Sequence, residues 1–336
     1  MNSTRADIRK EIFNVNNAAF ESVAIKIFMF QYEENLLYNQ YCKTLNISPG
    51  DINRIEQIPF LPIQFYKSKE ITTTTVVPET VFESSGTTGT VNSKHIIKDL
   101  SVYEESFLKS FLQFYGDVSQ YCILGLLPSY LERGNSSLVY MVNELIKRSG
   151  SPLSGFYLNE DEKLYNAIMQ NEAEGKQTLL IGVTYALLDF AEKYAVNLSH
   201  SIVMETGGMK GRRTELTREE VHTTLKQRLG IAEIHSEYGM TELLSQAYAV
   251  KNGIFNCPPW MQVLVRSEDD PFDISSRNTV RGQFSAGALN IIDLANLYSC
   301  SFIATDDVGK LYPGGSFEVL GRMDNSDIRG CGLMIL

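Results

Sequence analysis

The N-terminal part of the chain repeats apolar residues with the period of an α-helix. Between residues 8 and 45 they recur at spacings of three and four, so each helix would bury one face. The recurring positions are Ile8, Ile12, Phe13, Phe20, Val23, Ile27 and Phe28. Pro59 and Pro62 then interrupt the pattern and predict an extended segment. We therefore expect residues 1–80 to form a helical region that packs on the core.

Short apolar runs alternate with helical patterns in the middle of the chain. The apolar runs cover residues 121–127, 178–183 and 201–205, and the helical patterns cover residues 136–148, 160–173, 184–195 and 218–229. The last helix is preceded by Thr217 and Glu220, which have the spacing of a capping box. This alternation predicts a parallel, twisted sheet flanked by helices. We expect an α/β nucleotide-binding core over residues 81–254, with ligands bound beyond the carboxyl ends of its strands.

From about residue 255 the pattern changes to strand-like runs with few helical signals. The runs cover residues 255–265, 289–293, 302–305 and 316–320. They predict a smaller β-rich subdomain over residues 255–320, shaped as a distorted barrel. Residues 321–336 would form a hinge and a C-terminal tail.

Composition and charge exclude several classes of protein. The net charge is −10 and the pI about 5.1, so a broad basic surface for nucleic acid is not expected. The sequence contains no apolar run of about 18 residues, which predicts no transmembrane segment, and its first residues do not resemble a signal peptide. Five widely spaced cysteines without a CxxC pair indicate a reducing, cytoplasmic environment. The oligomeric state stays open.

A run of small polar residues is the first candidate for chemistry. Ser84, Ser85, Gly86, Thr87, Thr88 and Gly89 follow one another, and Lys94 comes five positions later. Glycines and hydroxyl residues allow a backbone to approach a ligand and to direct N–H groups at an anion. Apolar residues on both sides predict a strand–loop–strand cradle for nucleotide phosphates. The alternative is a polar surface loop.

A second stretch, Glu237-Tyr238-Gly239-Met240-Thr241-Glu242, changes the interpretation of the first. Together the two segments resemble the phosphate loop and the Tyr-Gly-Met-Thr-Glu motif of the adenylate-forming superfamily. The resemblance implies ATP and Mg²⁺ as cofactors and a carboxylic acid as substrate. It implies that the 84–94 loop binds the β- and γ-phosphates and that Tyr238 contacts adenine. It also implies that Thr241 contacts the α-phosphate and that Glu242 binds Mg²⁺. Otherwise Glu242 would be an ordinary acid at a helix N-terminus.

Three further segments are similar to motifs of the same superfamily. Gly207 and Gly208 match its adenine-side glycine loop. Thr305-Asp306-Asp307-Val308-Gly309 resembles a ribose-binding motif, in which the register selects Asp307 over Asp306. Gly321-Arg322-Met323-Asp324 resembles the hinge motif, whose Arg reaches ribose or phosphate. A β-turn and a solvated hairpin are the alternative interpretations of the last two.

Length and several shorter segments resemble the LuxE-type acyl-protein synthetases within that superfamily. The chain has 336 residues, and we expect it to lack the small C-terminal domain and the catalytic lysine that typical members carry. The matching segments include Ile58–Ile63, Pro258–Val263, Ile291–Asn296 and 324–331. The resemblance implies transfer of a fatty acyl group to a cysteine, for which Cys331 is the candidate, and delivery to a partner acyl reductase or another acceptor protein. Two alternatives remain: a phenylacetate-type acyl-CoA ligase, and a nucleotide-binding protein without turnover.

Overall fold

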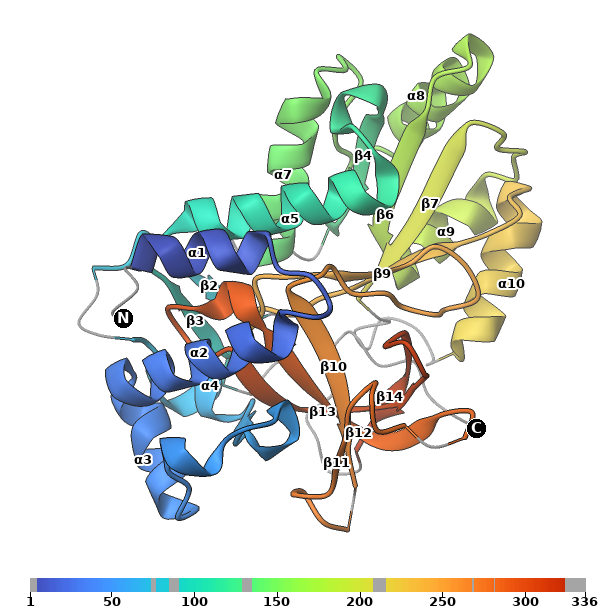
Figure 1. The fold of residues 1–336 in the computed structure, drawn as a ribbon. Coiled ribbons are helices and arrows are strands. Elements are labelled where there is room, and N and C mark those ends of the chain that lie inside the picture. The colour runs from blue at the N-terminus through green and yellow to red at the C-terminus, as the bar shows by residue number, and fades with distance from the viewer. Residues whose placement is uncertain are drawn as a thin grey trace.

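Two six-stranded sheets and a hairpin organise the chain (Figure 1). The computed structural model describes residues 5–73, 77–84, 91–128, 135–207, 216–267, 269–280 and 282–323. The first sheet has the strand order β5-β4-β6-β7-β8-β9. Its strands are β4 (Cys122–Leu126), β5 (Gly155–Phe156), β6 (Thr178–Val183), β7 (Ser201–Thr206), β8 (His235–Tyr238) and β9 (Ala247–Ala249). All neighbours are parallel except β9, which runs antiparallel to β8.

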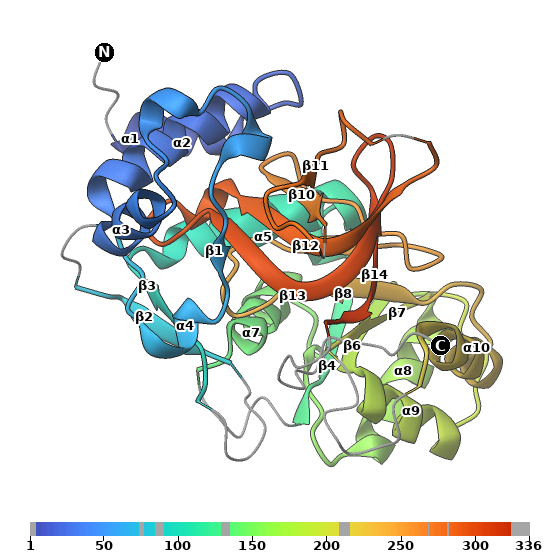
Figure 2. The same cartoon turned by 90° about the horizontal axis from the view of Figure 1, so that it is seen from below.

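Helices cover both faces of this parallel sheet, as its alternating sequence predicts. They are α7 (Ser137–Ser149), α8 (Asp161–Glu174), α9 (Thr184–Lys193) and α10 (Arg218–Leu229). Helix α7 lies on one side of the sheet and α9 and α10 on the other (Figure 2). The capping box of Thr217 and Glu220 is present at the start of α10, so this prediction is confirmed. The carboxyl ends of β7 and β8 carry Gly207 and Gly239, where the sequence predicts ligand binding.

The second sheet contains the C-terminal strands and one short strand from the N-terminal region. Its order is β1-β13-β12-β10-β11, and β14 also pairs with β13. The strands are β1 (Leu61–Pro62), β10 (Met261–Arg266), β11 (Ile274–Ser275), β12 (Ser285–Asp293), β13 (Phe302–Leu311) and β14 (Phe317–Arg322). The predicted run at 255–265 becomes a strand only from Met261, because Phe255 instead makes an isolated bridge to Phe317. The long, curved β13 spans this sheet and ends near β14 (Figure 2).

Residues 80–97 form an antiparallel hairpin of β2 (Thr80–Glu83) and β3 (Lys94–Ile97). Its last strand pair is Glu83 with Lys94. Beyond that pair, the Ser84 N–H donates to Ser93 O at 3.0 Å, and the Ser93 N–H donates to Ser84 Oγ at 2.8 Å. The predicted strand–loop–strand arrangement is therefore confirmed at the base of the Ser/Thr/Gly run.

The N-terminal helices pack on the second sheet through α2 and α3. The helices are α1 (Arg5–Phe13), α2 (Phe20–Glu34), α3 (Leu36–Thr44) and the short α4 (Phe65–Ser68). Phe28 of α2 and Tyr38 of α3 contact Phe302 of β13, with ring centroids 6.3 and 6.1 Å away. The buried Gln31 amide donates to the carbonyls of Asn296 and Leu297. These contacts fix the loop between β12 and β13, whose first residues also approach the 242–245 segment.

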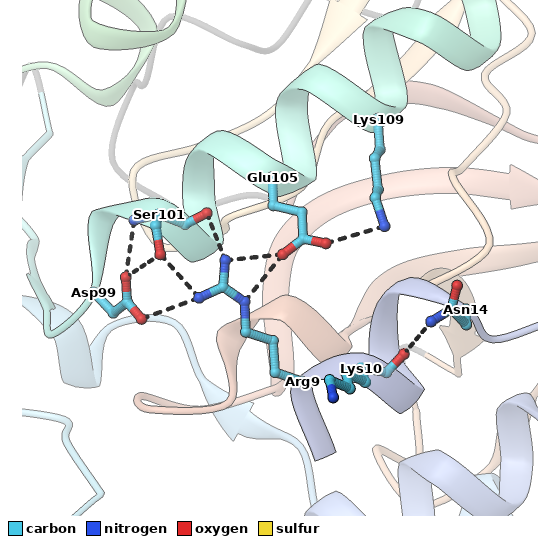
Figure 3. Close-up of polar contacts among 7 residues, drawn as sticks. All are labelled: Arg9, Lys10, Asn14, Asp99, Ser101, Glu105 and Lys109. Carbon is cyan, nitrogen blue, oxygen red and sulfur yellow. Dashed lines mark hydrogen bonds and ion pairs between the residues drawn. The ribbon is translucent and has the colours of Figure 1, made fainter. Parts of the chain in front are cut away.

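Helix α5 (Leu100–Tyr115), which the sequence pattern did not predict, joins the hairpin to β4. Its N-terminus is capped by Asp99, whose side chain accepts from the Ser101 N–H. Figure 3 shows how α1 docks there: the Arg9 guanidinium pairs with Asp99 at 3.2 Å and with Glu105 at 2.8 Å, and Lys109 also reaches Glu105. Because these side chains are about one-third exposed, each pair stabilises the docking by at most about 1 kcal/mol.

Candidate active site

The hairpin places the base of the phosphate loop against the Tyr-Gly-Met-Thr-Glu segment. His95 of β3 is buried, and its Nδ1 lies 2.8 Å from the carbonyl oxygen of Thr241. Burial lowers the pKa of His95 to about 4, so the ring is neutral near pH 7 and can donate one hydrogen bond to this carbonyl. Two motifs that lie 146 residues apart in the chain therefore meet here.

Lys94 precedes His95 and points to the opposite side of the strand. Its ammonium group lies 3.8 Å from Glu83, and 63% of its side chain is exposed. An exposed pair of this length is weak. The lysine is therefore available to turn toward a phosphate, which is the role the sequence predicts for it.

A buried carboxylate fixes the backbone directly after Glu242. Asp293 Oδ2 accepts from the N–H groups of Leu244 and Ser245 at 2.8 and 3.0 Å, and Oδ1 accepts from Ser245 Oγ at 2.6 Å. Burial raises the pKa of Asp293 to about 6, although these hydrogen bonds favour the ionised form. Asn296 Nδ2 donates to the carbonyl of Glu242 at 2.7 Å. The start of the β12–β13 connection thus holds the predicted metal ligand in place.

Three predicted nucleotide-side residues, Tyr238, Asp307 and Arg322, form one polar cluster with Asp306. The Tyr238 hydroxyl donates to Asp307 Oδ2 at 2.7 Å. Arg322 lies 3.3 Å from Asp307 and 3.2 Å from Asp306, which also accepts a hydrogen bond from Gln64. Strand pairing explains the contact, because Asp307 of β13 lies opposite Arg322 of β14. The cluster brings both acids of the Asp-Asp pair to one arginine, so the choice of Asp307 as the ribose ligand stays a prediction.

The Tyr238 ring is buried among aromatic side chains. Its exposed fraction is 3%, and it contacts Phe255 and Phe317 at centroid distances of 5.8 and 5.5 Å. These contacts fix the hydroxyl toward Asp307. A stacking role for this ring with adenine stays a prediction.

The ends of β7 and β8 carry two buried glutamates that the motif analysis did not single out as site residues. Glu205 lies 3.7 Å from His222 Nε2, and Glu237 accepts from the Thr206 hydroxyl. Burial opposes ionisation of Glu205, but the His222 hydrogen bond and the charge of Arg218 outweigh it and lower the pKa of that carboxyl. Burial raises the pKa of Glu237 to about 7.

Glu237 explains why a glycine follows Tyr238. A Cβ on Gly239 would lie 2.4 Å from Glu237 Oε1, closer than side-chain atoms approach one another. Gly207, at the end of the neighbouring strand, has a φ of +68°, which favours glycine. Both predicted glycines therefore have a steric reason at the strand ends.

Replacing Glu237 with Gln should change the pH dependence of stability. The pKa of Glu237 in the folded protein is raised above 4.5, so the folded protein holds a proton that the unfolded chain releases. This carboxyl therefore lowers the free energy of unfolding as the pH rises toward about 7. Glu237→Gln removes that loss. The unfolding free energy of the variant, relative to the parent, should increase by about 3 kcal/mol between pH 4 and pH 8 in urea titrations. Glu219→Gln, at an exposed position of α10, should show no such trend, and a flat difference for Glu237→Gln would contradict the burial argument.

Several predicted site residues lie outside the described part of the chain. They are Ser85, Gly86, Thr87, Thr88, Gly89, Gly208 and Cys331. Among the described residues, no group of three or more His, Cys, Asp or Glu side chains could hold a metal ion. A single carboxylate at Glu242 still suits Mg²⁺, which protein sites commonly bind through one or two carboxylates and the phosphates of the substrate.

Residues 13–336 match the family described as acyl-protein synthetase, LuxE. The chain belongs to the LuxE acyl-protein synthetase family. This match extends over both sheets and the whole polar cluster, so the family resemblance inferred from the motifs is confirmed. A search of curated protein sequences finds no match.

Solved structures of adenylate-forming enzymes share the fold. O-succinylbenzoate coenzyme A synthetase from Bacillus subtilis, with its acyl-adenylate intermediate OSB-AMP, is 15% identical with a TM-score of 0.51, over 74% of this chain and 50% of that one. The same enzyme with ATP and magnesium is 15% identical with a TM-score of 0.50, over 75% and 52%. A luciferase-like enzyme from the mealworm Zophobas morio is 18% identical with a TM-score of 0.49, over 77% and 61%.

The two similarities to O-succinylbenzoate coenzyme A synthetase confirm the α/β fold of the large domain of adenylate-forming enzymes. The LuxE-family chain spans about half to three-fifths of the length of the matched structures. In the described residues, none of the helices combines the length and the apolar character needed to cross a membrane.

Proposed function

We propose that this LuxE-family chain activates a carboxylic acid with ATP as an acyl-adenylate and passes the acyl group to a protein thiol. The observation that supports this most strongly is the contact between His95 and Thr241. It joins the base of the Ser/Thr/Gly loop to the Thr-Glu pair, so the segments proposed to hold the phosphates and Mg²⁺ lie next to each other in the fold. The family described as acyl-protein synthetase and the shared fold point to the same reaction.

The first step forms a bond between a carboxylate oxygen and the α-phosphorus of ATP, and the bond to pyrophosphate breaks. The chain's task is to position the reactants and to stabilise the charge on the phosphates. The hydroxyls and N–H groups of the 84–94 loop, with Lys94, would hold the β- and γ-phosphates. Thr241 would contact the α-phosphate, and Asp307 and Arg322 would hold the ribose.

Mg²⁺, when bound, would neutralise phosphate charge. Glu242 is the residue proposed to hold it, because its carboxylate supplies a hard oxygen ligand. Asp293 and Asn296 then act as positioning residues, since Asn296 fixes the Glu242 carbonyl and Asp293 fixes the N–H groups of the two residues at 244–245.

In the second step a thiolate attacks the acyl carbon, a thioester forms, and AMP leaves. Cys331 is the proposed acceptor, with Arg329 nearby in the sequence favouring the thiolate. Four other cysteines are buried or half-buried. Burial raises the pKa values of the Cys42, Cys257 and Cys300 thiols, which makes them poor nucleophiles. An acyl reductase or another acceptor protein would be the partner that receives the acyl group.

Incubation with ATP, Mg²⁺ and a radiolabelled fatty acid should give a hydroxylamine-labile adduct on the protein. Cys331→Ser should reduce this label to background, because the oxygen of serine is a far weaker nucleophile than a thiolate. The matched control is Cys257→Ser, which should retain the label. Equal labelling of Cys331→Ser and the parent protein would contradict the assignment of the acceptor.

A further inference from the structure

A cavity beside the nucleotide-side polar cluster lies between the N-terminal segment and the C-terminal sheet. Its volume is about 690 Å³, within the range of small-molecule sites. Residues 41–64 line one side, and strands β10, β11, β12 and β13 with residues 271–272 line the other. Its lining includes none of residues 84–94 or 237–242. It does include Asp306, whose carboxylate pairs with Arg322, so the cavity borders the nucleotide-side polar cluster but contains neither the phosphate loop nor the 237–242 segment.

Most of the cavity wall is apolar. Leu45, Ile52, Ile58 and Phe60 contribute from the N-terminal side. Phe272 contributes from the sheet side with 62% of its surface exposed. An exposed aromatic ring beside a buried apolar wall favours a ligand with an apolar body.

One cation is buried at this cavity. The Arg266 side chain donates to Leu289 O at 3.1 Å, to Asn290 Oδ1 at 2.6 Å and to Thr305 O, and makes no ion pair with the residues described. A guanidinium group has five N–H donors, so two remain beyond these three bonds. The Asp306 and Asp307 charges act on Arg266 from a distance but are themselves paired with Arg322. A buried cation without a carboxylate against it is costly, and an anionic ligand would remove that cost.

Asn290 adds a second donor beside the guanidinium. It is 1% exposed and lines the cavity, and its Nδ2 has no acceptor among the described residues. Its Oδ1 is occupied by Arg266, which fixes the amide with Nδ2 free to donate. The carboxylates at the cavity are already engaged: Asp51 with Ser48, Glu56 with Ser276, and Asp306 with Gln64 and Arg322. Arg266 and Asn290 therefore supply buried donors that a ligand in the cavity could use.

We propose that this cavity is a second binding site for a monocarboxylate with an apolar chain, whose carboxylate binds Arg266 and Asn290. The apolar chain lies against the wall formed by Leu45, Ile52 and Phe60. The site holds the molecule without reacting it, because the residues proposed for adenylation are not in its lining.

Comparing the affinities for decanoate and 1-decanol tests whether the site binds a carboxylate, because the two molecules have the same alkyl chain length and differ in the head group. Without ATP, isothermal titration should show decanoate binding at least tenfold more tightly than decanol. Arg266→Gln should remove that difference, whereas Arg228→Gln, an exposed control on α10, should keep it. Leu45→Trp narrows the cavity without touching Arg266 and should weaken both ligands at least tenfold, which keeps the test valid if Arg266→Gln fails to fold.

Glu242→Gln separates this site from the proposed function, since it should slow adenylation but leave this decanoate binding unchanged. Equal affinities for decanoate and decanol would overturn the proposal. Decanoate binding that neither Arg266→Gln nor Leu45→Trp weakens would also overturn the proposal. The adenylation site would remain as proposed in that case. Absence of decanoate binding to the parent protein would also overturn it.

Discussion

Glu242→Gln should slow carboxylate-dependent exchange of pyrophosphate into ATP about a hundredfold, on the order of 3 kcal/mol in the barrier, while ATP affinity changes only a few-fold. The reason is that a carboxylate ligand to Mg²⁺ contributes most to the rate in the transition state, where the charge on the transferring phosphate is greatest. The amide has almost the same shape and is a far weaker metal ligand. The buried backbone around residue 242 is fixed by Asn296 and Asp293, so the substitution should leave the fold intact.

Glu219→Gln is the control for this variant, because it removes one carboxylate from an exposed position of α10. Its exchange rate should equal that of the parent protein. ATP affinity measured by titration calorimetry separates binding from catalysis. An exchange rate for Glu242→Gln within twofold of the parent rate would remove Glu242 from the proposed mechanism.

Asp293→Ala should lower the free energy of unfolding by about 3 kcal/mol or more. The substitution leaves the N–H groups of Leu244 and Ser245 and the Ser245 hydroxyl without their acceptor in a buried place. Each buried donor without a partner costs about 1–3 kcal/mol. Urea denaturation at pH 8, where Asp293 is ionised, measures the effect.

Asp293→Asn distinguishes a positioning role from stability alone. The new amide retains one acceptor oxygen, but its NH₂ group faces N–H and hydroxyl donors that the second carboxylate oxygen accepted from. We therefore expect the folded variant to keep its ATP affinity and to lose at least tenfold in exchange rate. The exposed Asp269→Ala serves as the control and should change neither quantity. If Asp293→Asn retains the full rate while folded, the carboxylate only stabilises the fold.

Local patterns in the sequence predicted much of the fold because they depend on residues close together in the chain. The alternation of apolar runs and helical patterns gave the parallel sheet, and Thr217 with Glu220 marked the start of α10. The sequence pattern does not predict helix α5 because its apolar residues lie on more than one face: Leu112 is 60% exposed while Phe107 and Phe111 are buried. Its capping residue, Asp99, was the local signal that could have revealed it.

The motifs identified most of the candidate site, but not the contacts that join it. His95 meets Thr241 across the fold, and no local pattern reports a pairing of that kind. In the sequence, Ile291–Asn296 stands out only through the family resemblance; in the structure, the hydrogen bonds of Asp293 and Asn296 give this segment a physical role. Glu237 stands directly before Tyr238, and its raised pKa follows from burial at the end of β8 that sequence alone did not reveal.

Exchange of radiolabelled pyrophosphate into ATP, measured with panels of fatty and aromatic carboxylic acids, tests the central claim most directly. We expect exchange that requires Mg²⁺ and a carboxylic acid, and that falls about a hundredfold in Glu242→Gln. Each acid is measured with both the parent protein and that variant. If no acid raises exchange by the parent protein above that of Glu242→Gln, the chain does not form an acyl-adenylate.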